Sequence, residues 1–259
     1  MQTDMKEELL FYNAYQEFYK MANQSIAFST YCRKAFGEDF SQDGFSDLQQ
    51  LNKILSMVEL DSSSCVLDIG CGNGKVLEYI HKRNHSNIYG FDYSENAIAS
   101  AKHRMGNLGE LQVALIGEVD YAEEMFDLVL SLDTIYFAPD IPDFVSQIYR
   151  WLKPEGVFIC GYQEGDIMGK TENEHTSVLA NAFAVKGLTY EVIDYTKETY
   201  DMLHRKREAI DSMKEDFHKE GFDIWYEVVK NQTNCALESF DEYRVKNARY
   251  IYMVRKVGP

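Results

Sequence analysis

Short apolar runs alternate with amphipathic stretches through the middle of the chain. Five of these runs lie at 65–67, 87–91, 111–116, 126–132 and 157–162. Residues with apolar side chains at helical spacing fill most of the intervals between them. The run FDLVLSL is apolar almost throughout, which is typical of a strand buried on both faces. With two later strands, at 188–195 and 250–255, the pattern predicts a doubly wound α/β fold: a mostly parallel, seven-stranded sheet with helices on both faces.

Helical patterns also flank this α/β pattern. Aromatic residues recur at helical intervals over 6–27, and leucines recur over 46–61 behind Ser46, a residue suited to a helix N-cap. A further helix is expected at 174–186. Two more helices are expected within 196–247, a segment rich in charged residues between the last two strands. Both cannot be ordinary crossovers, so we expect them to cap one end of the sheet.

The expected organisation is a single domain over 1–259. Its N-terminal helices form a lid at 1–60. The α/β core takes 61–195 and 248–259, and the helical cap is an insertion at 196–247. The aromatic side chains of the lid have two readings, either as core residues or as the wall of a ligand pocket.

The stretch SCVLDIGCGNGK, at 64–75, contains the most unusual turn in the chain. A short strand ends near Asp68, glycines follow at alternate positions (Gly70, Gly72 and Gly74), and helix-forming residues then resume. Glycine permits positive φ and the close approach of another group, so this turn is suited to cradling a ligand. The helix behind the turn offers unpaired N–H groups to a polar ligand.

A carboxylate also ends the second predicted strand. Asp92 lies about twenty residues beyond the glycine turn, where it can accept hydrogen bonds from both hydroxyls of a ribose. A dinucleotide fingerprint needs GxGxxG, but the turn reads GxGxG with Lys75 at the place of the third glycine. Asp68 would repel a pyrophosphate and attract an ammonium or sulfonium. The pattern therefore favours a cationic nucleoside such as S-adenosylmethionine over a nicotinamide cofactor.

Charge and composition narrow the partners further. The chain has 42 acidic and 26 basic residues, a formal net charge of −16, and no cluster of Lys and Arg. Such a chain repels a phosphate backbone, so we expect no nucleic acid as substrate and a cationic or neutral small molecule instead. Five dispersed cysteines without CxxC or paired Cys/His spacing predict free thiols and no metal site. We expect a cytoplasmic protein, because the sequence shows neither a secretory signal nor a membrane-spanning run.

The sequence resembles the class I S-adenosylmethionine-dependent methyltransferases. VLDIGCGNG is similar to the first motif of that family, and the resemblance continues through YGFDYS, IGE, FDLVLSLDTIYF and LKPEGVF, over 64–162. Five elements in the family's order make it specific. The resemblance implies a Rossmann-like fold and methyl transfer from S-adenosylmethionine to a small-molecule N or O acceptor. A non-catalytic subunit that binds S-adenosylmethionine and a protein methyltransferase remain as alternatives.

The resemblance also implies roles for individual residues. The cofactor-binding residues would be Asp68, Gly70, Cys71, Gly72, Gly74, Asp92, Tyr93, Glu118, Val119, Ser131 and Leu132. Those of the glycine turn would hold the methionine part and Asp92 the ribose, while Tyr93, Glu118 and Val119 would contact the adenine. The residues from Ser131 to Asp133 would lie beside the sulfonium.

The acceptor side lacks a comparable motif. The lid and the cap are expected to form the acceptor pocket, with Tyr15, Tyr31, Tyr136 and Tyr162 as candidate substrate-binding residues. Candidate catalytic residues are Tyr136, His175 and Asp133. An amine that enters deprotonated needs no general base, whereas a hydroxyl acceptor has more need of one. Glu164 and Asp166 either attract a cationic acceptor or are ordinary loop residues.

Overall fold

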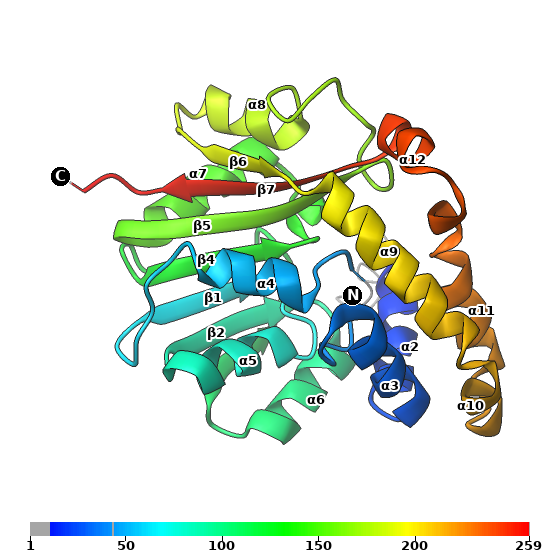
Figure 1. The fold of residues 1–259 in the computed structure, drawn as a ribbon. Coiled ribbons are helices and arrows are strands. Elements are labelled where there is room, and N and C mark those ends of the chain that lie inside the picture. Colours follow the sequence, from blue (N-terminus) through cyan, green and yellow to red (C-terminus); the bar gives the residue numbers. More distant parts are fainter. Residues whose placement is uncertain (1–10, 43, 259) are drawn as a thin grey trace.

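A seven-stranded sheet forms the centre of the molecule (Figure 1). The computed structural model describes residues 11–42 and 44–258. The strands are β1 (Cys65–Ile69), β2 (Asn87–Asp92), β3 (Gly109–Val113), β4 (Phe126–Leu132), β5 (Leu152–Glu164), β6 (Glu191–Asp194) and β7 (Ala248–Arg255). They lie in the order β3-β2-β1-β4-β5-β7-β6, and β7 is the strand that runs antiparallel to its neighbours. The predicted fold class is confirmed.

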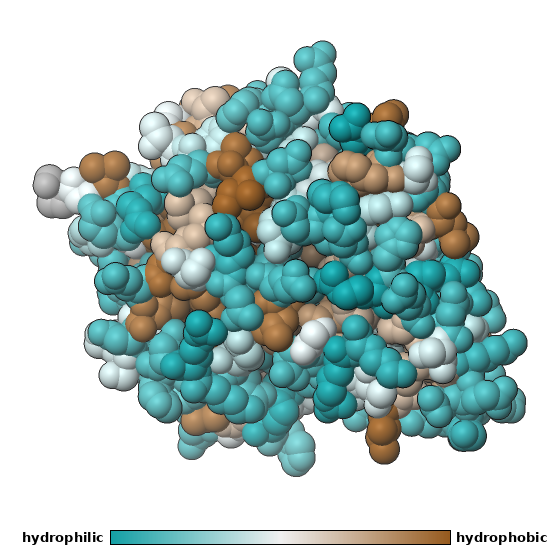
Figure 2. Space-filling model, viewed as in Figure 1, coloured by the Kyte–Doolittle hydropathy of each residue, from teal (hydrophilic) through white to brown (hydrophobic). Residues whose placement is uncertain are grey.

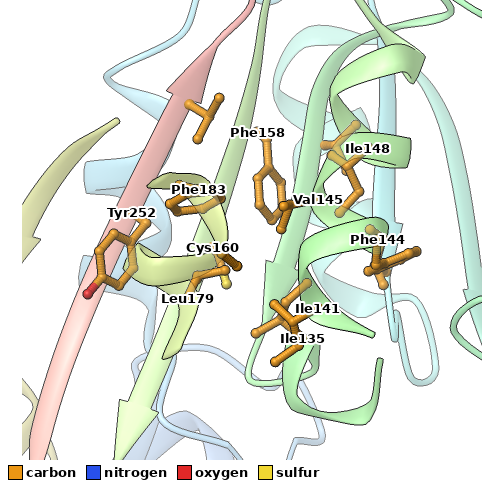
Figure 3. Close-up of a cluster of buried hydrophobic side chains, with 14 of the residues drawn as sticks. Ile135, Ile141, Phe144, Val145, Ile148, Phe158, Cys160, Leu179, Phe183 and Tyr252 are labelled. Carbon is orange, nitrogen blue, oxygen red and sulfur yellow. The ribbon is translucent and has the colours of Figure 1, made fainter. Parts of the chain in front are cut away.

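Helices cover both faces of the sheet. One face carries α4 (Leu48–Leu55), α5 (Lys75–Asn84) and α6 (Glu95–Met105), and the other carries α7 (Ile141–Trp151) and α8 (Val178–Val185). Because successive side chains of a strand point to opposite faces, Leu128 and Leu130 of β4 pack toward α4–α6 and Val129 packs toward α7. Figure 3 shows the second core, in which side chains of α7 and α8 meet those of β5, among them Phe158 and Cys160.

A third group of helices lies at one end of the sheet (Figure 1). It combines the N-terminal helices with the segment between β6 and β7. The helices are α2 (Tyr12–Ala22), α3 (Ile26–Phe36), α9 (Thr196–Asp211), α10 (Lys214–Lys219), α11 (Asp223–Asn231) and α12 (Phe240–Lys246). Their apolar faces share one buried cluster, in which Phe18, Phe28 and Tyr31 meet Leu203 and Phe217. The predicted lid and cap therefore pack against each other.

The N-terminal helix differs from the expected one. The pattern over 6–27 predicts a single helix, and its first five residues lie outside the described part of the chain. In the structure the helix breaks near Ser25. The Ser25 Oγ accepts a hydrogen bond from the Phe28 N–H at 2.8 Å and so caps a second helix, α3.

The helix predicted behind Ser46 is capped by the next residue instead. The Asp47 carboxylate accepts a hydrogen bond from the Gln50 N–H at 2.8 Å and begins α4. Ser46 has a tertiary role, because its Oγ accepts a hydrogen bond from the Arg249 guanidinium at 2.8 Å. Local spacing makes both residues good caps, and the partner from β7 decides between them.

Later boundaries shift as well. The turn expected before the strand VFICGY lies within β5, whose register against β4 shifts between Phe126 and Leu128. The helix predicted over 174–186 begins only after Ser177, whose Oγ accepts from the Ala180 N–H at 2.9 Å.

None of the helices in the described part of the chain has the length and hydropathy of a bilayer span. The face seen in Figure 2 is mostly hydrophilic, with its apolar residues in separate small patches.

Candidate functional site

A cavity of about 360 Å³ opens at the carboxyl ends of β1, β2 and β4. Its remaining walls come from 114–116 after β3, from 132–139 after β4, from α2 and from the segment between α3 and α4. The order β2-β1-β4 places the cavity where the strand order reverses. Ligands of open α/β sheets bind at this position.

The glycine turn forms one side of the cavity, and each glycine has its own reason. All three have positive φ, 72° at Gly70, 53° at Gly72 and 74° at Gly74. A Cβ on Gly70 would collide with the side chain of Thr134, and one on Gly72 would collide with the Tyr19 hydroxyl. Gly74 instead lies against α6 and outside the cavity lining. The first two glycines therefore allow the side chains of Thr134 and Tyr19 to approach the turn, and the third allows the turn to pack against α6.

The Asp92 carboxylate is held by the backbone at the end of β2. Its Oδ2 accepts from the Gly72 N–H at 2.9 Å and its Oδ1 from the Ser94 N–H at 2.8 Å. The side chain is buried, and burial raises the pKa of Asp92 to about 6 despite these two hydrogen bonds. Each oxygen keeps a lone pair for a further donor, such as a ribose hydroxyl.

The Asp68 carboxylate is buried at the end of β1. No residue in the described part of the chain donates a hydrogen bond to it, and the residue is 4% exposed. Burial, with a smaller contribution from the negative charge of Asp92, raises the pKa of Asp68 to about 8. A carboxylate in this state would be stabilised by a positively charged partner in the cavity.

The predicted cofactor-binding residues divide into two groups. Those that line the cavity are Asp68, Gly70, Cys71, Gly72, Asp92, Tyr93 and Leu132, and those outside it are Gly74, Glu118, Val119 and Ser131. Glu118 is exposed, and Val119 is buried in the core against α7. Ser131 turns to the side chain of Thr134, at 2.8 Å between the two hydroxyl oxygens. In place of Glu118 and Val119, residues 114–116 line this part of the cavity.

Asp133 lines the cavity but is already paired. Its carboxylate forms an ion pair with the fully buried guanidinium of Arg249 and accepts from the Phe45 N–H at 3.0 Å. Arg249 also donates to Ser46 and, at 3.3 Å, to Gln50. This network ties the end of β4 to β7 and to the chain before α4. The geometry gives Asp133 a structural task rather than that of a base.

Of the other acceptor-side candidates, some line the cavity and others lie elsewhere in the structure. Tyr15 and Tyr136 line the cavity, whereas Tyr31 lies in the helical cluster and Tyr162 in the core beneath Tyr136. The Tyr136 hydroxyl accepts from the Gln163 N–H at 2.5 Å, and burial holds the pKa of Tyr136 well above its usual value. His175 lies outside the cavity, with its Nδ1 3.0 Å from the Tyr190 hydroxyl. The geometry therefore does not support His175 as a base for a reaction in this cavity.

The cavity also has wall residues that the sequence reasoning did not select. These are Tyr19, Phe40, Gln42, Gly44, Asn73, Lys75, Val76, Phe91, 114–116, Thr134, Phe137 and Pro139. The Lys75 ammonium lies 2.7 Å from an Asp39 oxygen and 2.6 Å from the Ser41 hydroxyl, and so holds the segment between α3 and α4 beside the glycine turn. The aromatic spacing of α2 could have pointed to Tyr19, whereas no local signal marks the segment around Phe40.

Glu164 and Asp166 also lie outside this cavity. The Glu164 carboxylate is fully buried and accepts hydrogen bonds from the Thr171 N–H at 2.9 Å and from the Thr171 hydroxyl. It holds the loop after β5 in place. This contact favours the structural reading of Glu164 over attraction of an acceptor.

Residues 67–160 match the family model described as a methyltransferase domain. These residues thus form a methyltransferase domain. The matched region of this domain begins within β1, ends within β5, and contains the glycine turn, Asp92 and the end of β4. The predicted family resemblance is thus confirmed.

Relatives of the methyltransferase domain include phosphoethanolamine N-methyltransferases. Phosphoethanolamine N-methyltransferase 3 of Arabidopsis thaliana is 29% identical over 200 residues, which cover 71% of this chain and 40% of that protein. The Plasmodium falciparum phosphoethanolamine N-methyltransferase is 31% identical over 128 residues, 48% of this chain and 47% of that protein. The chain thus spans less than half the length of these curated relatives.

A solved structure extends the likeness beyond the matched domain. Phosphoethanolamine N-methyltransferase 2 of Haemonchus contortus, in complex with phosphomonomethylethanolamine and S-adenosylhomocysteine, superposes with a TM-score of 0.73. The two are 21% identical, and the match covers 94% of this chain and 60% of the other. At this identity the likeness shows a shared fold, which includes the helices outside 67–160.

Proposed function

We propose that this chain transfers a methyl group from S-adenosylmethionine to a small-molecule N or O acceptor. The observation that carries the proposal is the pair of buried carboxylates in one cavity. Asp68 has no hydrogen-bond donor within the described part of the chain and stands beside a turn suited to close approach. Asp92 presents oxygens at the end of the next strand. An ammonium group of a ligand would pair with Asp68, and the hydroxyls of a ribose would donate hydrogen bonds to Asp92.

The residues present fit S-adenosylmethionine in charge and shape. Asp68 would accept the ammonium of the methionine part, and the two hydroxyls of the ribose would donate to Asp92. Because Gly70 and Gly72 lack a Cβ, the side chains of Thr134 and Tyr19 can pack directly against the turn and form the cavity wall there. Tyr93, whose ring contacts those of Tyr15 and Phe137 at centroid distances of 6.1 and 6.4 Å, offers an aromatic wall for the adenine.

Bound S-adenosylmethionine supplies a methyl group on a sulfonium, which an in-line nucleophile can take. The chain contributes by holding the acceptor in line with that methyl group and by excluding water. α2 and the segment between α3 and α4 cover the cavity for this purpose. We assign Tyr136 as an orienting residue: its hydroxyl accepts from Gln163 and keeps its own proton, so it can donate to an acceptor.

Thermal unfolding with added ligands tests the cofactor. S-adenosylmethionine and S-adenosylhomocysteine should each raise the melting temperature in a saturable way, and NAD should not. His175→Ala serves as a matched control, because its ring lies outside the cavity and its loss should leave both shifts unchanged. Stabilisation by NAD alone, or by none of the three, would refute the proposal.

Turnover separates an enzyme from a binding module. Formation of S-adenosylhomocysteine should depend on added acceptor across a panel of amines and hydroxyl compounds. Binding of S-adenosylmethionine without turnover on any of them would instead favour the non-catalytic alternative.

A further inference from the structure

We infer that the acceptor is an amine without a phosphate or other anionic group, in contrast to the phosphorylated amine named for the curated relatives. The inference rests on the proposed function, since it concerns the acceptor end of the same cavity. Two observations carry it: the charge around the cavity and the aromatic side chains that line it.

The cavity has little to offer an anion. Its lining contains three carboxylates, those of Asp68, Asp92 and Asp133. Lys75 is the only basic residue among the lining residues that the structure describes. Its ammonium is already engaged, at 2.7 Å from Asp39 and 2.6 Å from the Ser41 hydroxyl. A phosphate would have to break this pair to gain a cationic partner.

The buried cation that pairs with Asp133 is also engaged within the protein. Arg249 lies behind Asp133, is fully buried, and is bound by the carboxylate of Asp133, the hydroxyl of Ser46 and the amide oxygen of Gln50. Recognition of a phosphate relies on charge-assisted hydrogen bonds from Arg or Lys. The charge of the Arg249 guanidinium is instead balanced by Asp133, inside the protein. The overall charge of −16 adds a repulsive field outside the cavity.

The same lining suits a cation. Tyr15, Tyr19, Phe40, Tyr136 and Phe137 contribute aromatic rings to the walls. The face of an aromatic ring attracts an ammonium, and the attraction strengthens where water is excluded. Burial holds the pKa of Tyr136 well above its usual value, so its ring remains a neutral phenol whose face can contact a cation. The aromatic walls therefore favour an amine at this end of the cavity.

The chemistry balances without a general base from the chain. The ammonium is attracted by the cavity and loses a proton to solvent before reaction. The lone pair of the neutral nitrogen then forms the new N–C bond, the C–S bond breaks, and its electron pair remains on sulfur as the thioether. The methylated ammonium product carries the positive charge that the sulfonium has lost. Among the lining residues that the structure describes there is no histidine, which agrees with this route.

The test uses the full chain saturated with S-adenosylhomocysteine and two simple probes, tetramethylammonium chloride and inorganic phosphate. Calorimetric titration should give saturable binding of tetramethylammonium and none of phosphate at equal ionic strength. Ethanolamine and phosphoethanolamine form a matched pair, in which the amine without phosphate should bind at least tenfold more tightly. Tighter binding of phosphate or phosphoethanolamine would overturn the inference, and so would a failure of tetramethylammonium to bind.

Variants of one ring locate the effect. Tyr136→Phe keeps the aromatic face and should retain binding of tetramethylammonium, whereas Tyr136→Leu should weaken it at least fivefold. Tyr190→Leu, outside the cavity, is the matched control and should change nothing. Affinity for S-adenosylhomocysteine, measured on each variant, reports an intact fold. If the unmodified chain does not bind S-adenosylhomocysteine, the proposed function itself fails. If it binds S-adenosylhomocysteine but not tetramethylammonium, only the inference about the acceptor fails. Equal binding of tetramethylammonium by the Phe and Leu variants would overturn the role of the ring.

Discussion

Affinity for S-adenosylhomocysteine should rise steeply between pH 6 and pH 7, because Asp68 must be ionised to pair with the ligand's ammonium. Burial raises the pKa of Asp68 to about 8, so the carboxyl of the ligand-free protein is mostly protonated throughout this range. The ligand's own ammonium stays charged there, since α-amino groups titrate near about 7.7–8.0. Ionisation of Asp68 is therefore the step that limits binding.

The size of the effect follows from the pKa of Asp68. With a value of about 8, the ionised fraction is about 1% at pH 6 and about 9% at pH 7, so affinity should rise about ninefold, or about 1.3 kcal/mol. Asp92, with a pKa of about 6, adds about a further twofold. Because both folded-state pKa values lie above the unfolded one, the ligand-free protein loses stability as pH rises through this window. Ligand binding should offset that loss.

Calorimetric titration of S-adenosylhomocysteine at these two pH values measures the effect, and buffers of different ionisation enthalpy report the proton released. Asp68→Asn is the matched variant: it keeps the size of the side chain and has no charge to titrate. Its affinity should be lower at pH 7 and nearly independent of pH, apart from the contribution of Asp92. Equal affinities at both pH values in the unmodified chain, or the same rise in the Asn variant, would show that ionisation of Asp68 does not control binding.

Three further substitutions test the site and its supports. Asp92→Ala should weaken binding of S-adenosylhomocysteine at least about tenfold, since hydrogen bonds to a charged group contribute roughly 1.5–3 kcal/mol; calorimetry measures it, and unchanged affinity would remove Asp92 from the site. Arg249→Met should lower the free energy of unfolding in urea by about 3–5 kcal/mol, because it leaves Asp133 without its partner, and adding Asp133→Asn should recover part of that loss. Gly70→Ala should cost about 1–3 kcal/mol, measured in the same way, because the new Cβ collides with Thr134 at positive φ; a stability equal to that of the unmodified chain would contradict the packing.

Much of the fold was predictable because its signals are local. The alternation of strand and helix, the positive φ of the glycine turn and the strand end at Asp92 each depend on a few consecutive residues. Boundaries were less predictable where two neighbours had equal local merit. Ser46 and Asp47 are both good N-caps. The buried guanidinium of Arg249 binds the Ser46 hydroxyl, and Asp47 caps the helix.

The candidate site was predictable on its nucleoside side and less so on its acceptor side. Asp68, the first glycines of the turn and Asp92 all come to the cavity, since one strand–turn–helix unit and the next strand suffice to place them. Glu118 does not, because the chain after β3 brings 114–116 to the cavity and turns Glu118 to solvent. The aromatic pattern of α2 left open whether its rings were core or pocket, and both occur: Phe18 is buried in the helical cluster while Tyr15 lines the cavity.

The kind of sheet, the glycine turn and the carboxylates at the strand ends could be predicted from the sequence, because backbone conformation and strand pattern depend on short stretches of consecutive residues. Which residues close the cavity depends on the packing of distant elements. Asp133 meets Arg249 across 116 positions of the chain, and Asp39 meets Lys75 across 36. Such pairs depend on how helices and strands pack, which no local pattern carries. Because these pairs engage Lys75 and Arg249, neither cation is available to an anionic acceptor, and this supports the acceptor that we propose.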